Sequence, residues 1–142
     1  MKKLLVPVDK SETAMRALAY AIRLAKGSGQ IEIHIVNAHD LPVIFNEIGA
    51  QGDFQRAMDL QKEHGEQSLK PAIDMLKGEN QPYTSAVLVG DVAHEIVQYA
   101  EQHGCDAIVM GTRGMGAVGN LLMGSVATKV VHLTKLPVTL IK

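Results

Sequence analysis

The sequence of 142 residues is long enough for one domain with a sizeable buried core, and we expect a single domain over residues 1–142. Apolar residues make up 46% and charged residues 20% of the chain, and the net charge of −1 gives no overall case for binding nucleic acid or a membrane. No apolar run approaches the roughly 20 residues that span a bilayer. No signal peptide is visible, and the single cysteine excludes an internal disulfide, so we expect a cytoplasmic protein.

The first apolar run, residues 4–8, is typical of a central parallel strand that is covered on both faces. Asp9 then stands at the carboxyl end of this strand, where open α/β sheets bind ligands. A second interpretation makes Asp9 and Glu12 the two ends of a capping box, and the two roles are compatible. The helix that follows should continue to Gly27 or Gly29, because apolar residues recur in it at helical spacing.

The middle of the chain continues the alternation of strands and helices. A second strand is predicted over residues 31–38 and a helix over residues 53–77. Pro71 lies inside this helix and should kink or break it near residues 68–70, because a proline removes one backbone hydrogen bond and clashes with the preceding turn. A third strand, over residues 84–89, then precedes the next helix.

The last part of the chain predicts two more strands. Asp91 should cap the helix after the third strand, and residues 107–110 and 136–141 form the fourth and fifth strands. Five strands and four helices in alternation predict a doubly wound, parallel α/β sheet with helices on both faces. The terminal strand is apolar and would be an edge, so we expect it to pair with another chain.

Residues 111–125 contain five glycines and lie between the fourth strand and a helix that should begin near Ser125. Glycines let the backbone approach a ligand closely, and successive N–H groups then form a nest for phosphate. The start of the helix adds free N–H groups and a favourable dipole. All fifteen acidic side chains lie within residues 1–106, so Arg113 and the later lysines give this loop positive surroundings. A purely structural turn remains the alternative.

Two familiar phosphate-binding motifs do not fit this loop. Gly114, Gly116 and Gly119 match the pattern G-x-G-x-x-G, but no acidic residue follows about 20 positions later, as a dinucleotide site requires. Residues 119–125 resemble a P-loop without its lysine, so a P-loop phosphotransferase is not indicated. The backbone of the loop should therefore hold the phosphates.

The glycine spacing is similar to the ATP-binding signature of the universal stress protein family. This resemblance covers essentially the whole chain, and its motifs are Pro7-Val8-Asp9-x-Ser11, Gly90-Asp91, Gly111-x2-Gly114-x9-Gly124-Ser125 and Pro137-Val138. It implies a sheet of order 3-2-1-4-5 and a homodimer that pairs through the last strand. It also implies binding of ATP or AMP, with an adenine contact at Val36, although the sequence alone favours simple core packing for this valine.

The candidate nucleotide-binding residues lie near the ends of predicted strands, in the glycine-rich loop or at the helix start that follows it. They are Pro7, Val8, Asp9, Val36, Met110, Gly111, Thr112, Arg113, Gly114, Met115, Gly116, Ala117, Gly124, Ser125 and Val126.

No catalytic constellation and no zinc-like spacing stands out in the sequence. Our first hypothesis is therefore an adenine-nucleotide sensor or adaptor of the stress response with an unidentified downstream partner. The alternatives are a slow metal-dependent ATPase or phosphotransferase, in which Asp9 would hold Mg²⁺ with ATP, and a nucleotide-free dimeric scaffold.

Overall fold

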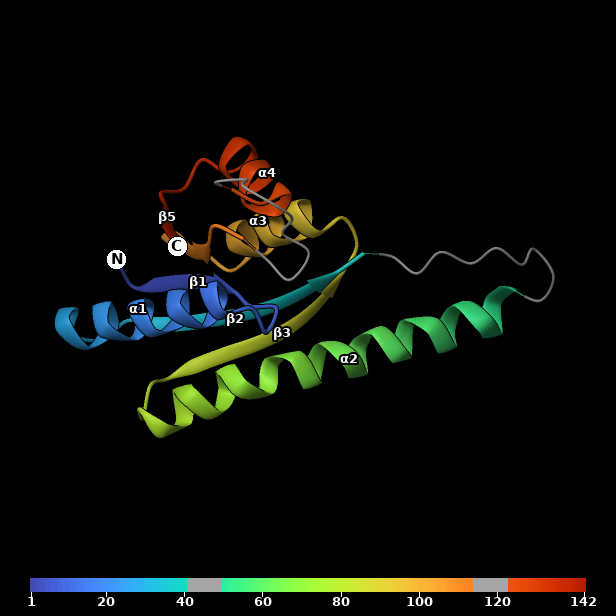
Figure 1. Cartoon of the computed structure of the whole chain (residues 1–142), viewed down its shortest axis with the longest axis horizontal. Coiled ribbons are helices and arrows are strands. Elements are labelled where there is room, and N and C mark those ends of the chain that lie inside the picture. Colours follow the sequence, from blue (N-terminus) through green and yellow to red (C-terminus); the bar gives the residue numbers. More distant parts are fainter. Residues whose placement is uncertain (41–49, 114–122) are drawn as a thin grey trace.

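The computed structural model describes residues 1–40, 50–113 and 123–142 of the chain. Strands and helices alternate through these ranges (Figure 1). The strands are β1 (Lys3–Pro7), β2 (Glu32–His39), β3 (Tyr83–Val89), β4 (Ala107–Gly111) and β5 (Val138–Ile141). The helices are α1 (Glu12–Ser28), α2 (Ala50–Gly78), α3 (Val92–Gln102) and α4 (Ser125–Leu133).

The strands form one parallel sheet in the order β3-β2-β1-β4-β5, which confirms the predicted fold class and strand order. β1 lies in the middle and pairs with β2 on one side and β4 on the other. After β1 the chain therefore adds β2 and β3 on one side of this strand. It then crosses over and adds β4 and β5 on the other side. In sheets of this kind, ligands bind at the carboxyl ends of the two strands where the direction reverses. Here these strands are β1 and β4.

Two helices cover each face of the sheet. Figure 1 shows α1 and α2 on one face and α3 and α4 on the other. The central strand β1 contributes side chains to the hydrophobic core on both faces of the sheet. Leu4 and Val6 pack under α1 and α2, while Leu5 packs with the residues of α3 and α4. All three side chains are fully buried, which explains why β1 reads as an uninterrupted apolar run.

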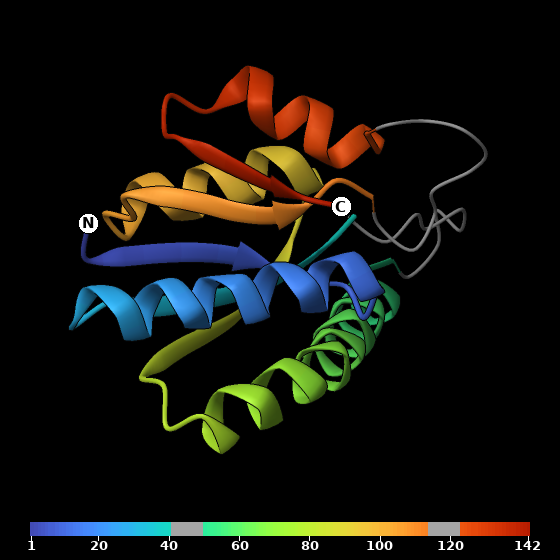
Figure 2. The same ribbon diagram turned by 60° about the vertical axis from the view of Figure 1, so that its left-hand side comes forward.

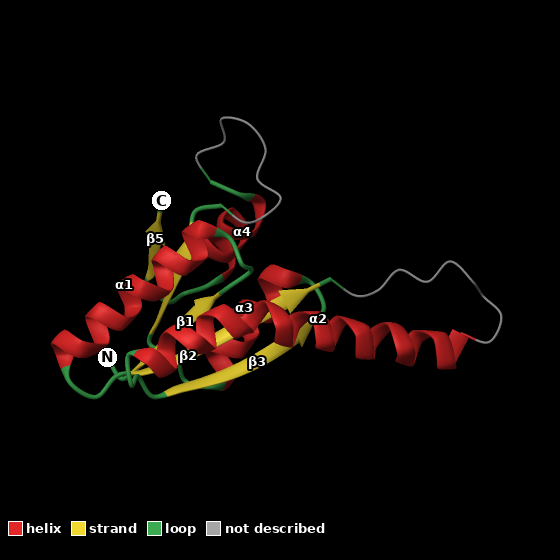
Figure 3. Ribbon diagram, turned by 60° about the horizontal axis from the view of Figure 1, so that its bottom comes forward, coloured by secondary structure: helices red, strands yellow, loops and turns green. Residues whose placement is uncertain are grey.

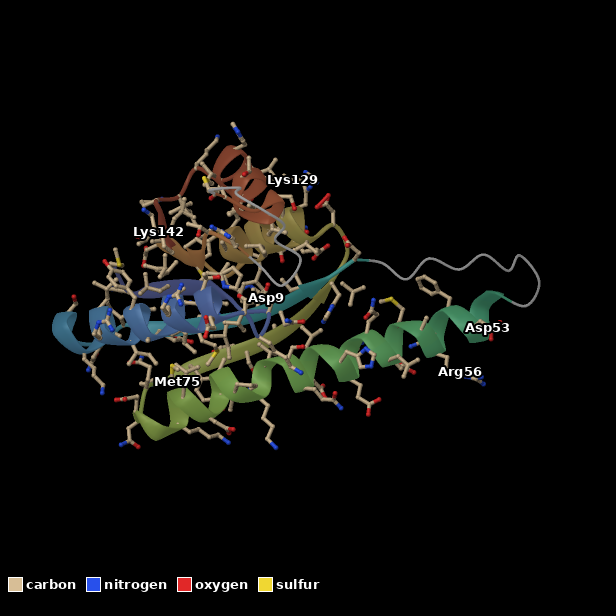
Figure 4. All side chains as sticks on the ribbon, viewed as in Figure 1. Asp9, Asp53, Arg56, Met75, Lys129 and Lys142 are labelled. Carbon is tan, nitrogen blue, oxygen red and sulfur yellow. The ribbon has the colours of Figure 1, made fainter. Side chains whose placement is uncertain are left out.

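Helix α2 runs without a break through Pro71, so the break expected near residues 68–70 is wrong. A proline in a helix interior costs about 3 kcal/mol. Leu69 and Leu76 flank this position and are buried against the sheet, and burial of each contributes about 1.5–3 kcal/mol. Packing therefore offsets the loss of one backbone hydrogen bond. The first half of the helix extends beyond the strands (Figure 3), and Asp53 and Arg56 lie on this part of it (Figure 4).

A buried polar cluster connects β2 with α3 at the end of the sheet opposite the candidate site. The His34 side chain is 4% exposed, and its Nδ1 lies 2.8 Å from the hydroxyl of Tyr99. Its Nε2 lies 3.0 Å from a carboxylate oxygen of Glu32, and the ring of Tyr99 stacks on His103 at 3.8 Å. Burial lowers the pKa of His34, and this effect outweighs the opposing effect of the Glu32 carboxylate. His34 is thus a core histidine with a polar partner.

We expect the protein to lose stability on acidification, in part because His34 is buried in its neutral form. The pKa of His34 lies below its ordinary value of 6.5 in the folded chain, so the unfolded chain binds the proton more readily. The contribution of His34 is complete above pH 6.5 and is lost as the pH falls through 6.5 toward the folded pKa. Urea denaturation at about pH 7.5 and about pH 5 measures it.

The comparison uses H34Q, with H132Q as the control because His132 is exposed on α4. Wild type and H132Q should lose more free energy of unfolding between the two pH values than H34Q does. Equal losses in all three proteins would show that His34 does not govern the acid sensitivity.

Candidate functional site

The carboxyl ends of β1 and β4 lie side by side at one edge of the sheet. The two strands are paired in register, with Leu4 opposite Ala107 and Leu5 opposite Ile108. Figure 2 shows the arrowheads of β1, β4 and β5 pointing to the same side, where α1 and α4 begin. Residues 7–9 and residues 110–113, which the sequence predicts to bind a nucleotide, therefore leave the sheet close to each other.

Asp9 lies directly after β1 at this edge (Figure 4). Its Oδ1 accepts the backbone N–H of Ser11 at 3.0 Å. Ser11, not Asp9, is the N-cap of α1, because its hydroxyl oxygen accepts the N–H of Ala14 at 3.2 Å. The capping box predicted for Asp9 and Glu12 is therefore wrong. Lys10 adopts a left-handed conformation with φ 72°, which adds one turn between strand and helix and moves the helix start to Glu12.

The backbone around Thr112 joins the end of β4 to the start of α4. The N–H of Thr112 donates to the carbonyl of Ile141 at 2.8 Å, and the carbonyl of Thr112 accepts the N–H of Gly124 at 2.5 Å. The two ends of the glycine-rich segment are thus hydrogen-bonded to each other. Of the predicted site residues, Gly114, Met115, Gly116 and Ala117 lie outside the described residues.

Helix α4 presents its amino-terminal end at this edge, as the sequence predicts. Gly124 is its N-cap. Thr128 donates two hydrogen bonds to the carbonyl of Gly124, one from its backbone N–H at 3.1 Å and one from its side-chain hydroxyl at 3.0 Å. Helical geometry leaves the N–H groups of Ser125, Val126 and Ala127 without acceptors inside the helix. The first turn carries no acidic side chain. This end of the helix can therefore attract an anion.

Val36 and Met110 lie deeper than the other predicted site residues. The Val36 side chain is fully buried and Met110 is 5% exposed, and both belong to the core beneath α3 and α4. The carbonyl of Val36 accepts the N–H of Val8 at 2.9 Å, so this backbone group already has a partner. Contact of Val36 with an adenine ring stays a prediction.

Two polar residues that the sequence analysis missed donate hydrogen bonds to backbone carbonyls beside this site. Asn37 is 2% exposed, and its Nδ2 donates to the carbonyl of Val8 at 2.7 Å, which fixes the chain just before Asp9. The available signal was an amide side chain directly after the apolar pair Ile35-Val36, near the carboxyl end of the strand. The hydroxyl of Thr13 donates to the carbonyl of Arg113 at 2.5 Å. No local pattern indicates this contact, because the two residues are 100 positions apart.

Asp91 occupies the N-cap position of α3, as predicted, but its side chain does not cap the helix. Its carboxylate lies 3.2 Å from Nδ1 of His94, and a hydrogen bond from this histidine lowers the pKa of Asp91. Gly90 ties the end of β3 to β2, because its N–H donates to the carbonyl of His39 at 2.8 Å.

Within residues 1–40, 50–113 and 123–142, no three His, Cys, Asp or Glu side chains come together in a way that could hold a metal ion. None of the helices in the described part of the chain is long and apolar enough to cross a membrane.

Comparison with known proteins places the whole chain among relatives of one kind. The sequence profile of the universal stress protein family matches residues 1–142. The universal stress protein MJ0531 of Methanocaldococcus jannaschii is 33% identical over 141 residues, which are 99% of this chain and 82% of that protein.

Solved structures share the fold. The solved structure of the hypothetical protein MJ0577 superposes with a TM-score of 0.82 at 28% identity, over 99% of this chain and 95% of that one. The M. jannaschii protein of this name is called a universal stress protein. A universal stress protein family member from Arabidopsis thaliana with AMP bound superposes with a TM-score of 0.67 at 18% identity, over 100% and 92% of the two chains.

Proposed function

Because the chain belongs to the universal stress protein family, we propose that it binds an adenine nucleotide, ATP or AMP, at the carboxyl ends of β1 and β4. The hydrogen bond from the Gly124 N–H to the Thr112 carbonyl carries this proposal. It holds the amino-terminal end of α4, with its free N–H groups, beside the strand end where ligands bind in such sheets. The AMP-bound relative shares 18% identity with this chain, so it supports the fold alone.

The two parts of the site suit the two parts of a nucleotide. The glycine-rich segment and the first turn of α4 offer backbone N–H groups and the hydroxyl of Ser125, which suit phosphate oxygens. Asp9 offers a carboxylate, which suits a ribose hydroxyl or an amino group of the base. We assign the remaining contacts to the residues that the sequence predicts, which are Pro7, Val8, Val36, Met110, Gly111, Thr112, Arg113, Gly114, Met115, Gly116, Ala117, Gly124 and Val126.

We propose that nucleotide occupancy is a signal, so that the protein acts in the cytoplasm as a sensor or adaptor of the stress response. A sensor needs to bind ATP without consuming it. The rival proposal is a slow ATPase or phosphotransferase in which Asp9 holds a magnesium ion with ATP. The glycine-rich segment lacks the lysine of a P-loop, which argues against the phosphotransferase.

Ser125 and Asp9 separate the two proposals. For a sensor, S125A should weaken ATP binding about tenfold, or roughly 1.4 kcal/mol, because one hydroxyl contact to phosphate is lost. Hydrolysis should stay near background in wild type and in D9N. Calorimetry measures the first effect and release of inorganic phosphate the second. Magnesium-dependent turnover near about 1 per second that D9N removes would establish the enzyme instead.

We also propose a homodimer that pairs through β5. The N–H of Ile108 donates to the carbonyl of Pro137 and that of Thr112 to the carbonyl of Ile141. Alternate residues of a strand turn their backbone groups to opposite sides, so Val138 and Leu140 turn theirs away from β4. An edge of this kind is a template for a strand of a second chain. A nucleotide-free scaffold would keep this interface and would not bind ATP.

A further inference from the structure

Thr13 connects the first turn of α1 with the point where the chain leaves β4. Its hydroxyl donates to the carbonyl of Arg113 at 2.5 Å and lies 3.3 Å from the hydroxyl of Ser11. Ser11 caps α1 and donates its backbone N–H to the Asp9 carboxylate. A short chain of contacts therefore runs from Asp9, on one side of the candidate site, to Arg113 on the other.

The end of β4 is shaped to accept this contact. An added Cβ at Gly111 would lie 2.6 Å from Oγ1 of Thr13 and 2.9 Å from its backbone carbonyl carbon, distances that real side chains do not reach. Glycine thus allows α1 to approach β4 closely enough for the Thr13 hydroxyl to reach the carbonyl of Arg113. Thr13 is partly exposed, so its hydroxyl is not needed to satisfy a sealed core.

Three hydrogen bonds hold the backbone at residues 112 and 113. The Thr112 N–H is bound to β5, and the Thr112 carbonyl is bound to the start of α4. The Arg113 carbonyl is bound by the Thr13 side chain. The first two bonds join backbone groups, so exchanging one side chain for another leaves them in place unless the new residue is proline, whereas the third depends on one hydroxyl group.

We propose that Thr13 is a positioning residue for phosphate binding. Its hydroxyl fixes the Arg113 carbonyl and thereby supports the adjoining carbonyl of Thr112, which holds the Gly124 N–H at the start of α4. Without this bond the peptide at Arg113 is free to rotate, the contact between Thr112 and Gly124 is held less firmly, and the N–H groups in the first turn of α4 are less well oriented toward a phosphate. The inference rests on the proposed nucleotide site and adds to it a residue that need not touch the ligand.

The test replaces the hydroxyl while keeping the shape of the side chain. T13V removes the donor, T13S keeps it, and T84V is the matched control, because the Thr84 hydroxyl donates to Glu32 at the opposite end of the sheet. Each protein is titrated with ATP and with adenosine, which has no phosphate, and the melting temperature without ligand is recorded. T13V should bind ATP about tenfold more weakly, the size of effect that one ordinary hydrogen bond produces.

The pattern across ligands separates positioning from a structural role. Adenosine affinity should change less than about twofold in T13V, and T13S and T84V should bind ATP like wild type. If T13V binds ATP as wild type does, or if ATP and adenosine lose affinity equally together with a lower melting temperature, the positioning role is wrong and the nucleotide site stands. If wild type itself does not bind ATP, both the proposed function and this inference fall.

Discussion

G111V is expected to weaken ATP binding by more than about tenfold and to lower the free energy of unfolding by about 1–3 kcal/mol. Any Cβ at position 111 would lie 2.6–2.9 Å from atoms of Thr13, including one of its backbone atoms. Rotation of the Thr13 side chain cannot relieve this clash, because one of the clashing atoms belongs to the backbone. The start of α1 must therefore move away from β4. That movement separates Thr13 from the carbonyl of Arg113 and displaces the Asp9 side of the site.

G27A provides the matched control, because it adds a methyl group to a glycine that lies within α1. No atom lies within 4 Å of the position that its Cβ would take. Gly27 is in the last turn of the helix, where alanine should raise stability by up to about 1 kcal/mol and leave ATP binding unchanged. Thermal denaturation and calorimetry measure both quantities. A G111V protein with wild-type stability and ATP affinity would contradict the close approach of α1 to β4.

V138P is expected to convert the proposed dimer into a monomer. The backbone N–H of Val138 turns away from β4, so the proline removes a donor of the outer edge and leaves the hydrogen bonds between β4 and β5 in place. Light scattering at protein concentrations of tens of micromolar should report a dimer for wild type and a monomer for the variant.

V138A is the control for this change, since it shortens the side chain and keeps the N–H group. It should remain a dimer. A wild-type protein that is monomeric under the same conditions would disprove pairing through β5, and a dimeric V138P would place the interface elsewhere on the molecule.

Patterns of apolar residues were sufficient to predict the sheet. The apolar run at residues 4–8 predicted a strand covered on both faces, and Leu4, Leu5 and Val6 are all fully buried in the structure. The glycine-rich stretch correctly indicated that a strand ends before it and a helix begins at Ser125. The strand order came from the family resemblance, because hydrophobic periodicity alone does not specify which strands are neighbours.

The failures arose where distant parts of the chain decide the outcome. Pro71 stays inside a helix because buried leucines on either side hold it against the sheet. Asp9 is a local exception, because it does not cap α1 when the neighbouring Lys10 takes a left-handed conformation. Thr13 and Asn37 act on backbone carbonyls that are brought to them only by the folded sheet. Contacts of this kind leave no periodic trace in a sequence.

Calorimetric titration of ATP into the wild-type protein, with G111V alongside, tests the nucleotide site most directly. We expect saturable binding of one nucleotide per chain to wild type and a strong loss of affinity in G111V. Absence of any binding heat with wild type up to about 1 mM ATP, where even a weak complex of about −4 kcal/mol would be half formed, would contradict the account.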